Sequence, residues 1–348
     1  MKKILVYRFS AMGDVILLLP VLKGVLVANT DVEIFLLTQS SFAPLFTGIE
    51  RLHLVKADLK NEHKGFSGLY KLFRSICSEV KPQQVFDLHG VLRSFVLDFF
   101  FRLSGYKVQV FKKGTLQKRR VIKSKLLNQL PGTVDRYSEV FISAGFNLTL
   151  PESPVFAPSK LPVRFSEVCQ KSIIIGIAPF AKHQQKIWGV DKIDELIKKL
   201  NDHYDCTILL FGGGKAEFDI LNELAEKHSN CVVSSNYFNF NDEINLMHRL
   251  SLMVSMDSAN MHLASMAGVP TVSIWGATHP ALGFAPYKQP AENMIQYTGP
   301  ELACRPCSVY GNKKCIYSDS IRCMEYISVD SVLGRIKQLI PVPENQNR

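Results

Sequence analysis

Four polar segments follow predicted strands, and we ask of each whether its residue types suit the binding of an anionic group. The first is Arg8–Asp14 (RFSAMGD), which comes directly after the apolar stretch Lys2–Tyr7. Gly13 permits close backbone approach, and Asp14 falls at the start of a predicted helix. A carboxylate there either stabilises the helix start as an N-cap or first-turn residue, or serves as a general base at the floor of a cleft. The segment is not a dinucleotide fingerprint, because the G-x-G-x-x-G pattern is absent.

The second segment is Ser255–Ala264 (SMDSANMHLA), which is followed by Gly268–Gly276 (GVPTVSIWG). A strand ends there, a polar turn follows, and a helix is predicted from about Ser258. Free N–H groups at that helix start suit a diphosphate, although Asp257 and Ser258 also make an acceptable capping turn. The next strand ends in a second polar loop, Gly276–Pro280, on the same edge of the sheet. Two such loops on one edge favour a phosphate-binding site over capping alone.

Two other loops follow predicted strands of the second half. Pro179–Trp188 (PFAKHQQKIW) contains two lysines and a histidine, which suit an anionic ligand or, as readily, a solvated loop. Phe211–Glu217 (FGGGKAE) is a glycine-rich strand-to-helix turn. It lacks the full phosphate-loop pattern G-x-x-x-x-G-K-[ST], so the signal for nucleoside triphosphate hydrolysis is weak.

Strands alternate with helices along the chain, which predicts two α/β halves with parallel sheets. The first half has predicted strands at Lys2–Tyr7, Val32–Thr38, His53–Lys56 and Gln84–Leu88. The second has them at Ser172–Ala178, Cys206–Phe211, Leu252–Met256 and Thr271–Trp275. The Pro-rich stretch Leu148–Pro162 is the predicted linker. Ligands bind at the carboxyl ends of strands in such sheets, so the cleft between the halves is the expected site.

The 348-residue chain is basic, with 41 Lys and Arg against 31 Asp and Glu, a formal net charge of +10. This excess favours an anionic partner (nucleic acid, a membrane surface or a phosphorylated substrate) or only aids solubility. Residues 112–125 hold a run of cations without a carboxylate: Lys112, Lys113, Lys118, Arg119, Arg120, Lys123 and Lys125. We interpret this run as a contact for a phosphate- and carboxylate-bearing acceptor or for anionic membrane, with a solvated basic helix or loop as the alternative. Nucleic acid is not expected, because aromatic residues are not interleaved with the charges.

The N-terminal residues superficially resemble a signal peptide. However, Arg8 and Asp14 interrupt the apolar stretch, and no clean small-residue cleavage site follows. No apolar run reaches the roughly 18–20 residues that a membrane helix needs. We therefore expect a cytoplasmic protein, with at most a peripheral contact at the inner membrane.

Four cysteines near the C-terminus have the spacing C-x₂-C-x₇-C-x₇-C: Cys304, Cys307, Cys315 and Cys323. The first pair has metal-knuckle spacing, and the intervening Arg-Pro makes a tight turn. The cluster suits a structural zinc site, with free or occasionally oxidised thiols on a surface loop as the alternative. Stable disulfides are disfavoured in a cytosolic enzyme.

Taken together, the motifs resemble glycosyltransferase family 9, the lipopolysaccharide heptosyltransferases. The S-x-M-G-D start at Ser10–Asp14 is similar, and so is the block D-S-[AG]-x-M-H-L-A-x-x-x-G-V-P-T-V-x-x-[WF]-G-x-T-x-P at Asp257–Pro280. Weaker similarities are Asp87–Ser94 (DLHGVLRS) and Val134–Tyr137 (VDRY). The resemblance spans nearly the whole chain. It implies the α/β architecture GT-B, in which two Rossmann-like domains have parallel sheets that face each other across a cleft.

On this resemblance, residues 1–155 form an acceptor-side domain and residues 163–325 a nucleotide-sugar-binding domain, followed by a C-terminal helix and tail at 326–348. The family implies inversion at the anomeric carbon, ADP-heptose as the usual donor, and an anionic glycolipid acceptor, the inner core of lipopolysaccharide or a related lipid. No metal or other cofactor is required for catalysis, and the sequence has no Asp-x-Asp motif.

The resemblance also implies residue roles. Asp14 would be the general base, Lys186 in the K-x-W position would neutralise the leaving diphosphate, and Glu217 would contact the adenosine ribose. Asp257, with the helix start that follows it, would hold the donor, and Thr278 would lie near the phosphates. The donor-binding set is Lys186, Glu217, Asp257, Ser258, Asn260, Met261, His262 and Thr278. The acceptor-binding set is Ser10, Met12, Gly13, Arg93, Lys118, Arg119 and Arg120.

Two other classes of function stay open. One is a non-catalytic binding protein of GT-B shape that uses the basic run and the cysteine loop to dock partners. The other is a zinc-stabilised nucleic-acid binder. The transferase is favoured because the base, diphosphate and donor positions all carry chemically competent residues.

Overall fold

The computed structural model describes residues 1–156, 160–317 and 320–341, and its contacts divide the chain into two compact units. Unit 1 consists of Met1–Gly114 and Pro131–Glu152. Unit 2 consists of Thr115–Leu130 and the chain from Ser153 onward. The chain therefore leaves unit 1 after Gly114, contributes one helix to unit 2 and then returns.

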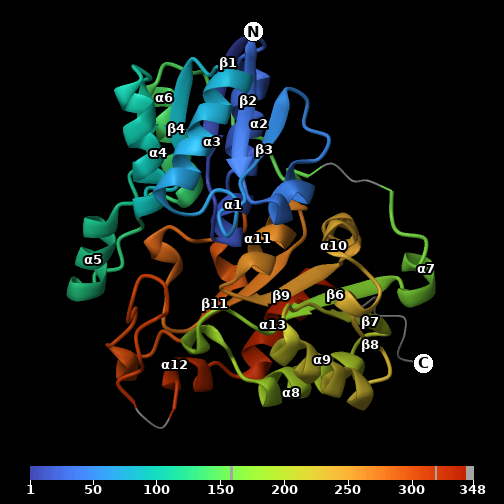
Figure 1. Cartoon of the computed structure of the whole chain (residues 1–348). Helices are drawn as coiled ribbons and strands as arrows, with labels where there is room; N and C mark the ends of the chain where they lie inside the picture. The colour runs from blue at the N-terminus through green and yellow to red at the C-terminus, as the bar shows by residue number, and fades with distance from the viewer. Residues whose placement is uncertain (157–159, 318–319, 342–348) are drawn as a thin grey trace. The chain divides into compact units, whose positions relative to one another are not determined.

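Unit 1 is an open, all-parallel sheet with helices on both faces (Figure 1). The strands pair in the order β3-β2-β1-β4-β5. They are β1 (Lys2–Tyr7), β2 (Val32–Thr38), β3 (Leu52–Lys56), β4 (Gln84–Asp87) and β5 (Val108–Val110). The helices are α1 (Met12–Ile16), α2 (Leu19–Ala28), α3 (Gly65–Glu79), α4 (Leu92–Leu103) and α6 (Thr133–Ser143).

Helices cover both faces of this sheet, so its central strands are apolar at consecutive positions. On one face, Leu5 and Val85 belong to a core that includes Leu72 of α3 and Phe101 of α4. On the other, Phe86 stacks on Phe141 of α6 with ring centroids 4.6 Å apart. Neighbouring residues of β4 thus point to opposite layers, as the period of two in a strand requires.

Unit 2 is a second all-parallel sheet, with the strand order β11-β10-β9-β6-β7-β8. Its strands are β6 (Ile173–Ala178), β7 (Cys206–Leu210), β8 (Cys231–Val233), β9 (Leu252–Met256), β10 (Thr271–Trp275) and β11 (Met294–Gln296). Its helices are α5 (Thr115–Ser124), α7 (Phe165–Val168), α8 (Val190–Asn201), α9 (Lys215–Lys227), α10 (Phe240–Leu246), α11 (Ala259–Met266), α12 (Arg322–Glu325) and α13 (Val329–Leu339). Counted from β6, this is the doubly wound order 3-2-1-4-5-6.

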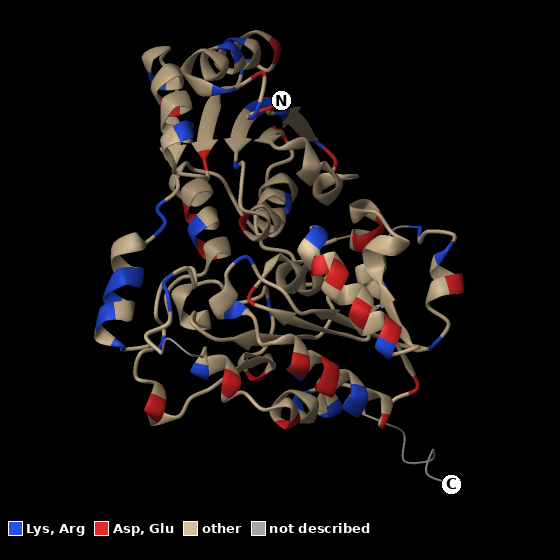
Figure 2. Ribbon diagram, turned by 60° about the horizontal axis from the view of Figure 1, so that its bottom comes forward, with Lys and Arg blue, Asp and Glu red and all other residues tan. Residues whose placement is uncertain are grey.

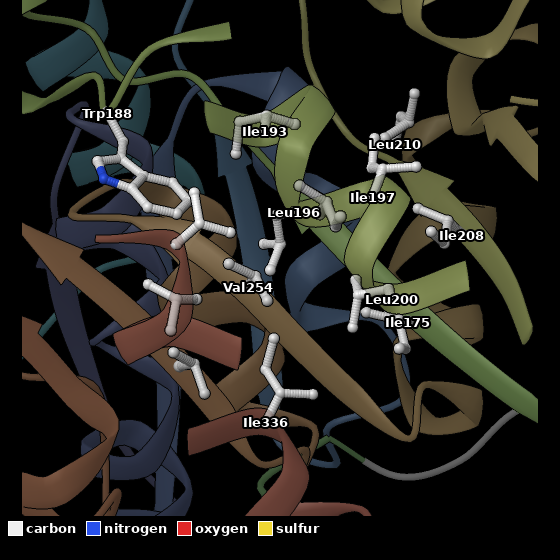
Figure 3. Packing of buried hydrophobic residues seen from close by; sticks show 14 of the residues in the cluster. Ile175, Trp188, Ile193, Leu196, Ile197, Leu200, Ile208, Leu210, Val254 and Ile336 are labelled. Carbon is white, nitrogen blue, oxygen red and sulfur yellow. The ribbon is translucent and has the colours of Figure 1, made fainter. Parts of the chain in front are cut away.

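The core of unit 2 packs α8 and α13 onto one face of the sheet (Figure 3). Ile193, Leu196, Ile197 and Leu200 of α8 recur at helical spacing and are fully buried. Trp188 joins them just before α8, and its indole N–H donates to the carbonyl oxygen of Ile327, 3.0 Å away. This packing fixes the end of the loop that contains Lys186.

The longest helix in the described ranges is α3, with 15 residues. Within those ranges no helix is both long and apolar enough to span a bilayer.

The predicted fold class, two Rossmann-like α/β units with parallel sheets, is confirmed. All eight predicted strands occur, with their ends shifted by at most one residue. Three strands were not predicted, β5, β8 and β11, and each has only three residues. The predicted linker spans the boundary at residues 152 and 153, but its residues 157–159 lie outside the described part, as do residues 342–348 of the predicted tail.

Candidate functional site

In unit 2 the predicted donor residues meet where the winding of the sheet reverses. Strands β6 and β9 are neighbours there, and both run in the same direction. The loop with Lys186 follows β6, and Asp257 follows β9 directly. Loops at such a reversal diverge to opposite sides of the sheet, which is why open α/β sheets bind ligands at this point.

Lys186, Asp257 and Thr278 form one connected group, which we name the donor cluster. The ammonium of Lys186 lies 2.6 Å from Oδ2 of Asp257, and the hydroxyl of Thr278 donates to the same oxygen at 2.7 Å. The side chains of Lys186 and Asp257 are only 14% and 8% exposed. The carboxylate therefore holds a cation and a hydroxyl group together at the carboxyl edge of the sheet.

The loops around this cluster approach each other closely. A Cβ atom on Gly276 would lie 2.7 Å from Cε of Met324 and 2.8 Å from the carbonyl oxygen of Gln185. The N–H of Ala277 donates to that same carbonyl oxygen at 3.3 Å. Only glycine therefore fits at position 276, where the loop after β10 contacts the loop that contains Lys186.

Helix α11 begins beside Asp257 without a side-chain cap. Ser258 is its N-cap residue, but its hydroxyl lies 3.1 Å from the hydroxyl of Ser255 and makes no capping bond to the helix. The side chain of Ser258 therefore does not cap α11, although the sequence allowed that alternative. Of the other predicted donor residues on α11, Asn260 is half-buried, whereas Met261 and His262 are buried.

Glu217 lies in the first turn of α9, after the next strand of the sheet, β7. Its Oε2 accepts a hydrogen bond from the N–H of Gly213 at 2.8 Å. The carboxylate of Glu217 therefore stabilises the glycine-rich turn Gly212–Gly214 through this hydrogen bond. Its position after the neighbouring strand places Glu217 on the same edge of the sheet as the donor cluster.

Arg305 was not predicted as a site residue, yet it organises the loop after β10. Its side chain is buried, and its N–H groups donate to the carbonyl oxygens of Gly276 (2.5 Å), Trp275 (3.0 Å), Thr278 (3.1 Å) and Tyr297 and to the side-chain oxygen of Gln296 (3.3 Å). Burial, and then the charge of Arg305, lower the pKa of His279 in the same loop to about 4. The only signal in the sequence was an arginine between two cysteines.

All four clustered cysteines line one cavity of about 10 Å³, with Leu302 and Ile321 among the other lining residues. The thiols are free, and burial, followed by the neighbouring thiols, raises the pKa of Cys307 to about 12. In the described part of the chain, no three Cys, His, Asp or Glu side chains are arranged as a metal site. By chemistry and size, four thiols around space for a single atom match the ligand set of zinc or iron.

The basic run begins with Lys112 and Lys113 before α5, continues along α5 and ends at Lys125 directly after it. Its cations from Lys118 onward divide into two groups. Lys118 is buried, with its ammonium 4.0 Å from the centre of the Phe284 ring. The ammonium of Lys125 donates to the carbonyl oxygens of Cys304 (2.7 Å) and Pro306 (3.0 Å). The contacts of these two lysines hold α5 and the residue after it against the rest of unit 2. The predicted acceptor residues Arg119 and Arg120 are exposed, along the basic helix visible at the left of Figure 2.

In unit 1, Asp14 lies in the first turn of α1 and forms an ion pair with Arg8. Arg8 is 6% exposed and also donates to the carbonyl oxygen of Leu88 at 2.5 Å. The hydroxyl of Tyr137 donates to the main-chain oxygen of Asp14 at 3.3 Å. The side chain of Asp14 keeps 28% of its surface exposed, so the carboxylate is oriented by a buried cation and still open to solvent.

The carboxyl end of β4 adds a second group, which the sequence had shown only as a weak similarity. Asp87 accepts hydrogen bonds from the N–H groups of His89 (2.7 Å) and Gly90 (2.9 Å) and from the hydroxyl of Ser94 (2.7 Å). Nε2 of His89 lies 3.4 Å from the hydroxyl of Ser10. Burial, and then the charges of Arg8, Lys113 and Arg93, lower the pKa of His89 to about 3. Thus Ser10 and His89 are brought together, while Arg93 lies exposed on α4.

Comparison with known protein families places these groups in context. The model of "Glycosyltransferase family 9 (heptosyltransferase)" matches residues 70–314. Lipooligosaccharide heptosyltransferase 2 of Campylobacter jejuni is 28% identical over 173 residues. That alignment covers 48% of this chain and 51% of the relative, so the chain spans about half the length of the relative that it matches.

Solved structures resemble the whole chain. The glycosyl transferase family 9 protein from Veillonella parvula has a TM-score of 0.75 at 19% identity, with 97% of each chain covered. The heptosyltransferase WaaC of E. coli with ADP has a TM-score of 0.68 at 17% identity, covering 97% of this chain and 100% of that one. At these identities the likeness confirms the fold.

The low pKa of His89 predicts an acid-dependent loss of stability. The unfolded state binds a proton near pH 6.5, whereas the folded state binds it only near pH 3, so stability falls as the pH decreases from 6.5. Between pH 7 and pH 5, the wild type should lose about 2 kcal/mol more free energy of unfolding than His89→Gln. Urea unfolding, followed by a probe within unit 1, measures this difference. An identical pH dependence in both proteins would show that His89 is not held neutral.

Proposed function

Because the chain belongs to glycosyltransferase family 9, we propose that it transfers a heptose or related sugar from an ADP-sugar to the inner core of lipopolysaccharide or a related lipid, with inversion at the anomeric carbon. The observation that carries the proposal is the donor cluster, a cation and a hydroxyl group held by one carboxylate where the winding of the sheet reverses. Similar proteins support the choice of substrates: WaaC was solved with ADP, and the Campylobacter relative is a lipooligosaccharide heptosyltransferase.

On the donor side, the chemistry to be done is the departure of ADP. The leaving diphosphate gains negative charge, which a preorganised cation and N–H groups stabilise. Lys186 supplies the cation, Thr278 a hydroxyl donor, and the uncapped start of α11 the N–H groups. Asp257 contributes by holding Lys186 and Thr278 in place. Glu217 is proposed to contact the ribose hydroxyls from the neighbouring strand end.

On the acceptor side, the attacking hydroxyl must lose a proton as its oxygen bonds to the anomeric carbon. Asp14 is the proposed base, because it is an oriented and partly exposed carboxylate. Ser10 lies in the loop before α1, and Met12 and Gly13 lie in the first turn of α1 with Asp14. All three are proposed to contact the acceptor. The exposed Arg119 and Arg120 are proposed contacts for its phosphates, and the same proposal requires Lys118 to act from a buried position. A cytoplasmic location remains a prediction from the sequence.

The first test is calorimetric titration with ADP, UDP and GDP. The wild type should prefer ADP, and Lys186→Ala should weaken ADP binding by about 10- to 100-fold, because a charge-assisted contact is lost. Lys182→Ala is the matched control, since Lys182 is an exposed lysine of the same loop. Preference for UDP or GDP would keep the transferase and overturn the ADP-sugar. No binding of any nucleotide by folded protein would favour the non-catalytic alternative.

The second test separates chemistry from binding. Asp14→Asn should lower the rate of sugar transfer by about 10²- to 10⁴-fold, because the general base is removed. ADP affinity should stay unchanged, because Asp14 lies in unit 1 and the donor cluster in unit 2. Asp330→Asn is the control, since Asp330 is also a first-turn carboxylate with a cationic partner, Lys199 at 2.6 Å. Near-normal turnover in Asp14→Asn would show that Asp14 is not the general base.

We also propose that the four cysteines hold one structural zinc ion. Arg305 and Cys307 connect the cysteine loop to the loop with Thr278, because the N–H of Cys307 donates to the carbonyl oxygen of Ala277 at 2.8 Å. A metal there would stabilise the loop that carries part of the donor cluster, without entering the reaction.

Metal analysis of purified protein tests the zinc proposal. About one zinc per chain is expected, and Cys304→Ser with Cys307→Ser should lose the metal and lower the melting temperature. Cys77→Ser, a half-buried thiol of unit 1, should keep the metal. Metal-free wild type with the melting temperature of the double variant would refute the site, and iron in place of zinc would change only the identity of the ion.

A further inference from the structure

Helix α4 of unit 1 is apolar on two opposite sides, although only one side is covered. Its inner side buries Leu97, Phe100 and Phe101 against the sheet. A second line of residues is exposed, namely Leu92 (81%), Phe95 (48%), Phe99 (56%) and Leu103 (76%). Their spacing of three and four residues places them on one face of the helix. A surface helix normally exposes polar residues on the side opposite its buried stripe, so this exposed apolar line needs an explanation.

Helix α3 extends this face into a continuous surface. Phe66 and Tyr70 are 64% and 47% exposed. Both rings pack against Phe100, with centroids 5.0 Å and 5.3 Å away, and the ring of Phe99 lies 5.9 Å from that of Phe100. We name these exposed residues the α3–α4 surface: Phe66, Tyr70, Leu92, Phe95, Phe99 and Leu103. A hollow of about 470 Å³ lies on α4, lined by Phe95, Phe99 and Leu103 together with Asp98 and Arg102.

The charges on these two helices are mostly positive. Their cations are Lys71, Arg74, Arg93 and Arg102, all exposed. Their carboxylates are Glu79, near the end of α3, and Asp98, which is buried. Burial raises the pKa of Asp98 to about 7 and so reduces its charge further. The α3–α4 surface is therefore apolar and aromatic, and most exposed charges on its two helices are cations, of which Arg102 lines the hollow beside Phe95 and Phe99.

We propose that the α3–α4 surface docks on an anionic phospholipid bilayer. Aromatic rings and leucines enter the boundary between headgroups and acyl chains, while arginines and lysines pair with anionic headgroups. The reason for docking rests on the proposed function, since a lipid-linked acceptor is presented at a membrane surface. The binding itself follows from the surface alone.

Charge complementarity favours a bilayer over a second copy of the chain. A symmetric dimer through this face would place its cations against the same cations of the other copy, which costs free energy. Lys71 is already paired with Glu62 at 2.8 Å, so anionic lipid would pair with Arg74, Arg93 and Arg102. An acidic protein is the remaining partner, and the following experiment distinguishes it.

The test is co-sedimentation of the full-length protein with vesicles that contain no acceptor glycolipid. Vesicles of equal parts phosphatidylcholine and phosphatidylglycerol should bind the wild type at least about tenfold better than phosphatidylcholine alone. Phe95→Ser with Phe99→Ser should lower this binding by at least about tenfold, and Arg74→Gln with Arg102→Gln should remove most of the preference for anionic lipid. Val27→Ser with Ile142→Ser is the matched control, because these residues are exposed on α2 and α6, which cover the other face of the sheet.

The outcomes separate docking from transfer. Loss of vesicle binding in the Phe95/Phe99 variant, with ADP affinity and melting temperature retained, supports the proposal. Failure of the wild type to bind anionic vesicles overturns it, whatever the transferase activity. Equal binding by that variant and the wild type also overturns it, because a surface other than the α3–α4 surface then binds the vesicles. Vesicle binding by a wild type that binds no nucleotide would keep the docking surface and reject the proposed function.

Discussion

Several loops of unit 2 are arranged around one interaction, the ion pair between Lys186 and Asp257. Two charges that are 14% and 8% exposed are expensive to remove from water, and such a pair is retained only where geometry and additional hydrogen bonds offset that cost. Thr278 supplies one of these bonds, and Arg305 fixes the loop that carries Thr278. Residues from three segments, after β6, β9 and β10, are therefore needed to stabilise one carboxylate.

The hydrogen bonds of Asp257 indicate that it acts through Lys186 and Thr278 rather than by touching the diphosphate. A diphosphate and a carboxylate repel each other, so Asp257 is unsuited to contact the phosphates directly. Its oxygen Oδ2 already accepts from both Lys186 and Thr278. An arriving diphosphate would share these two donors with Asp257. On the proposed function, Asp257 keeps the cation oriented before the donor arrives, and preorganisation of this kind lowers the free energy needed to stabilise the leaving group.

Unit 1 repeats the constraint with other residues. Its winding also reverses between two adjacent parallel strands, β1 and β4, and the chemical groups again follow those strands. Arg8 orients Asp14 after β1, and Asp87 orders the turn at His89 after β4. Strand order alone therefore brings together residues that are some 80 positions apart, such as Ser10 and His89. The sequence separation hides the contact, and the fold creates it.

The sequence predicted the strands of four to seven residues and the loops that follow them, because mainly apolar runs of this length carry a clear pattern. It did not predict β5, β8 or β11, since three residues are too few for any periodicity. Arg305 was missed because its partners lie up to 30 positions away and are carbonyl oxygens, which every residue type has. Lys118 was predicted as an acceptor contact with its neighbours, because a run of charges does not reveal which ones become buried.

The use of cations inside the fold also changes the meaning of the net charge of +10. Arg51 donates to the carbonyl oxygens of Asn29 and Val32, each at 2.8 Å, and Lys192 donates to that of Ile327 at 2.7 Å. Lys125 and Arg305 act in the same way. Main-chain oxygens carry no formal charge, so these cations raise the net charge without requiring an anionic partner. The cations that remain for partners are exposed ones, among them those on α5 and on α3 and α4, and their positions are more informative than their total.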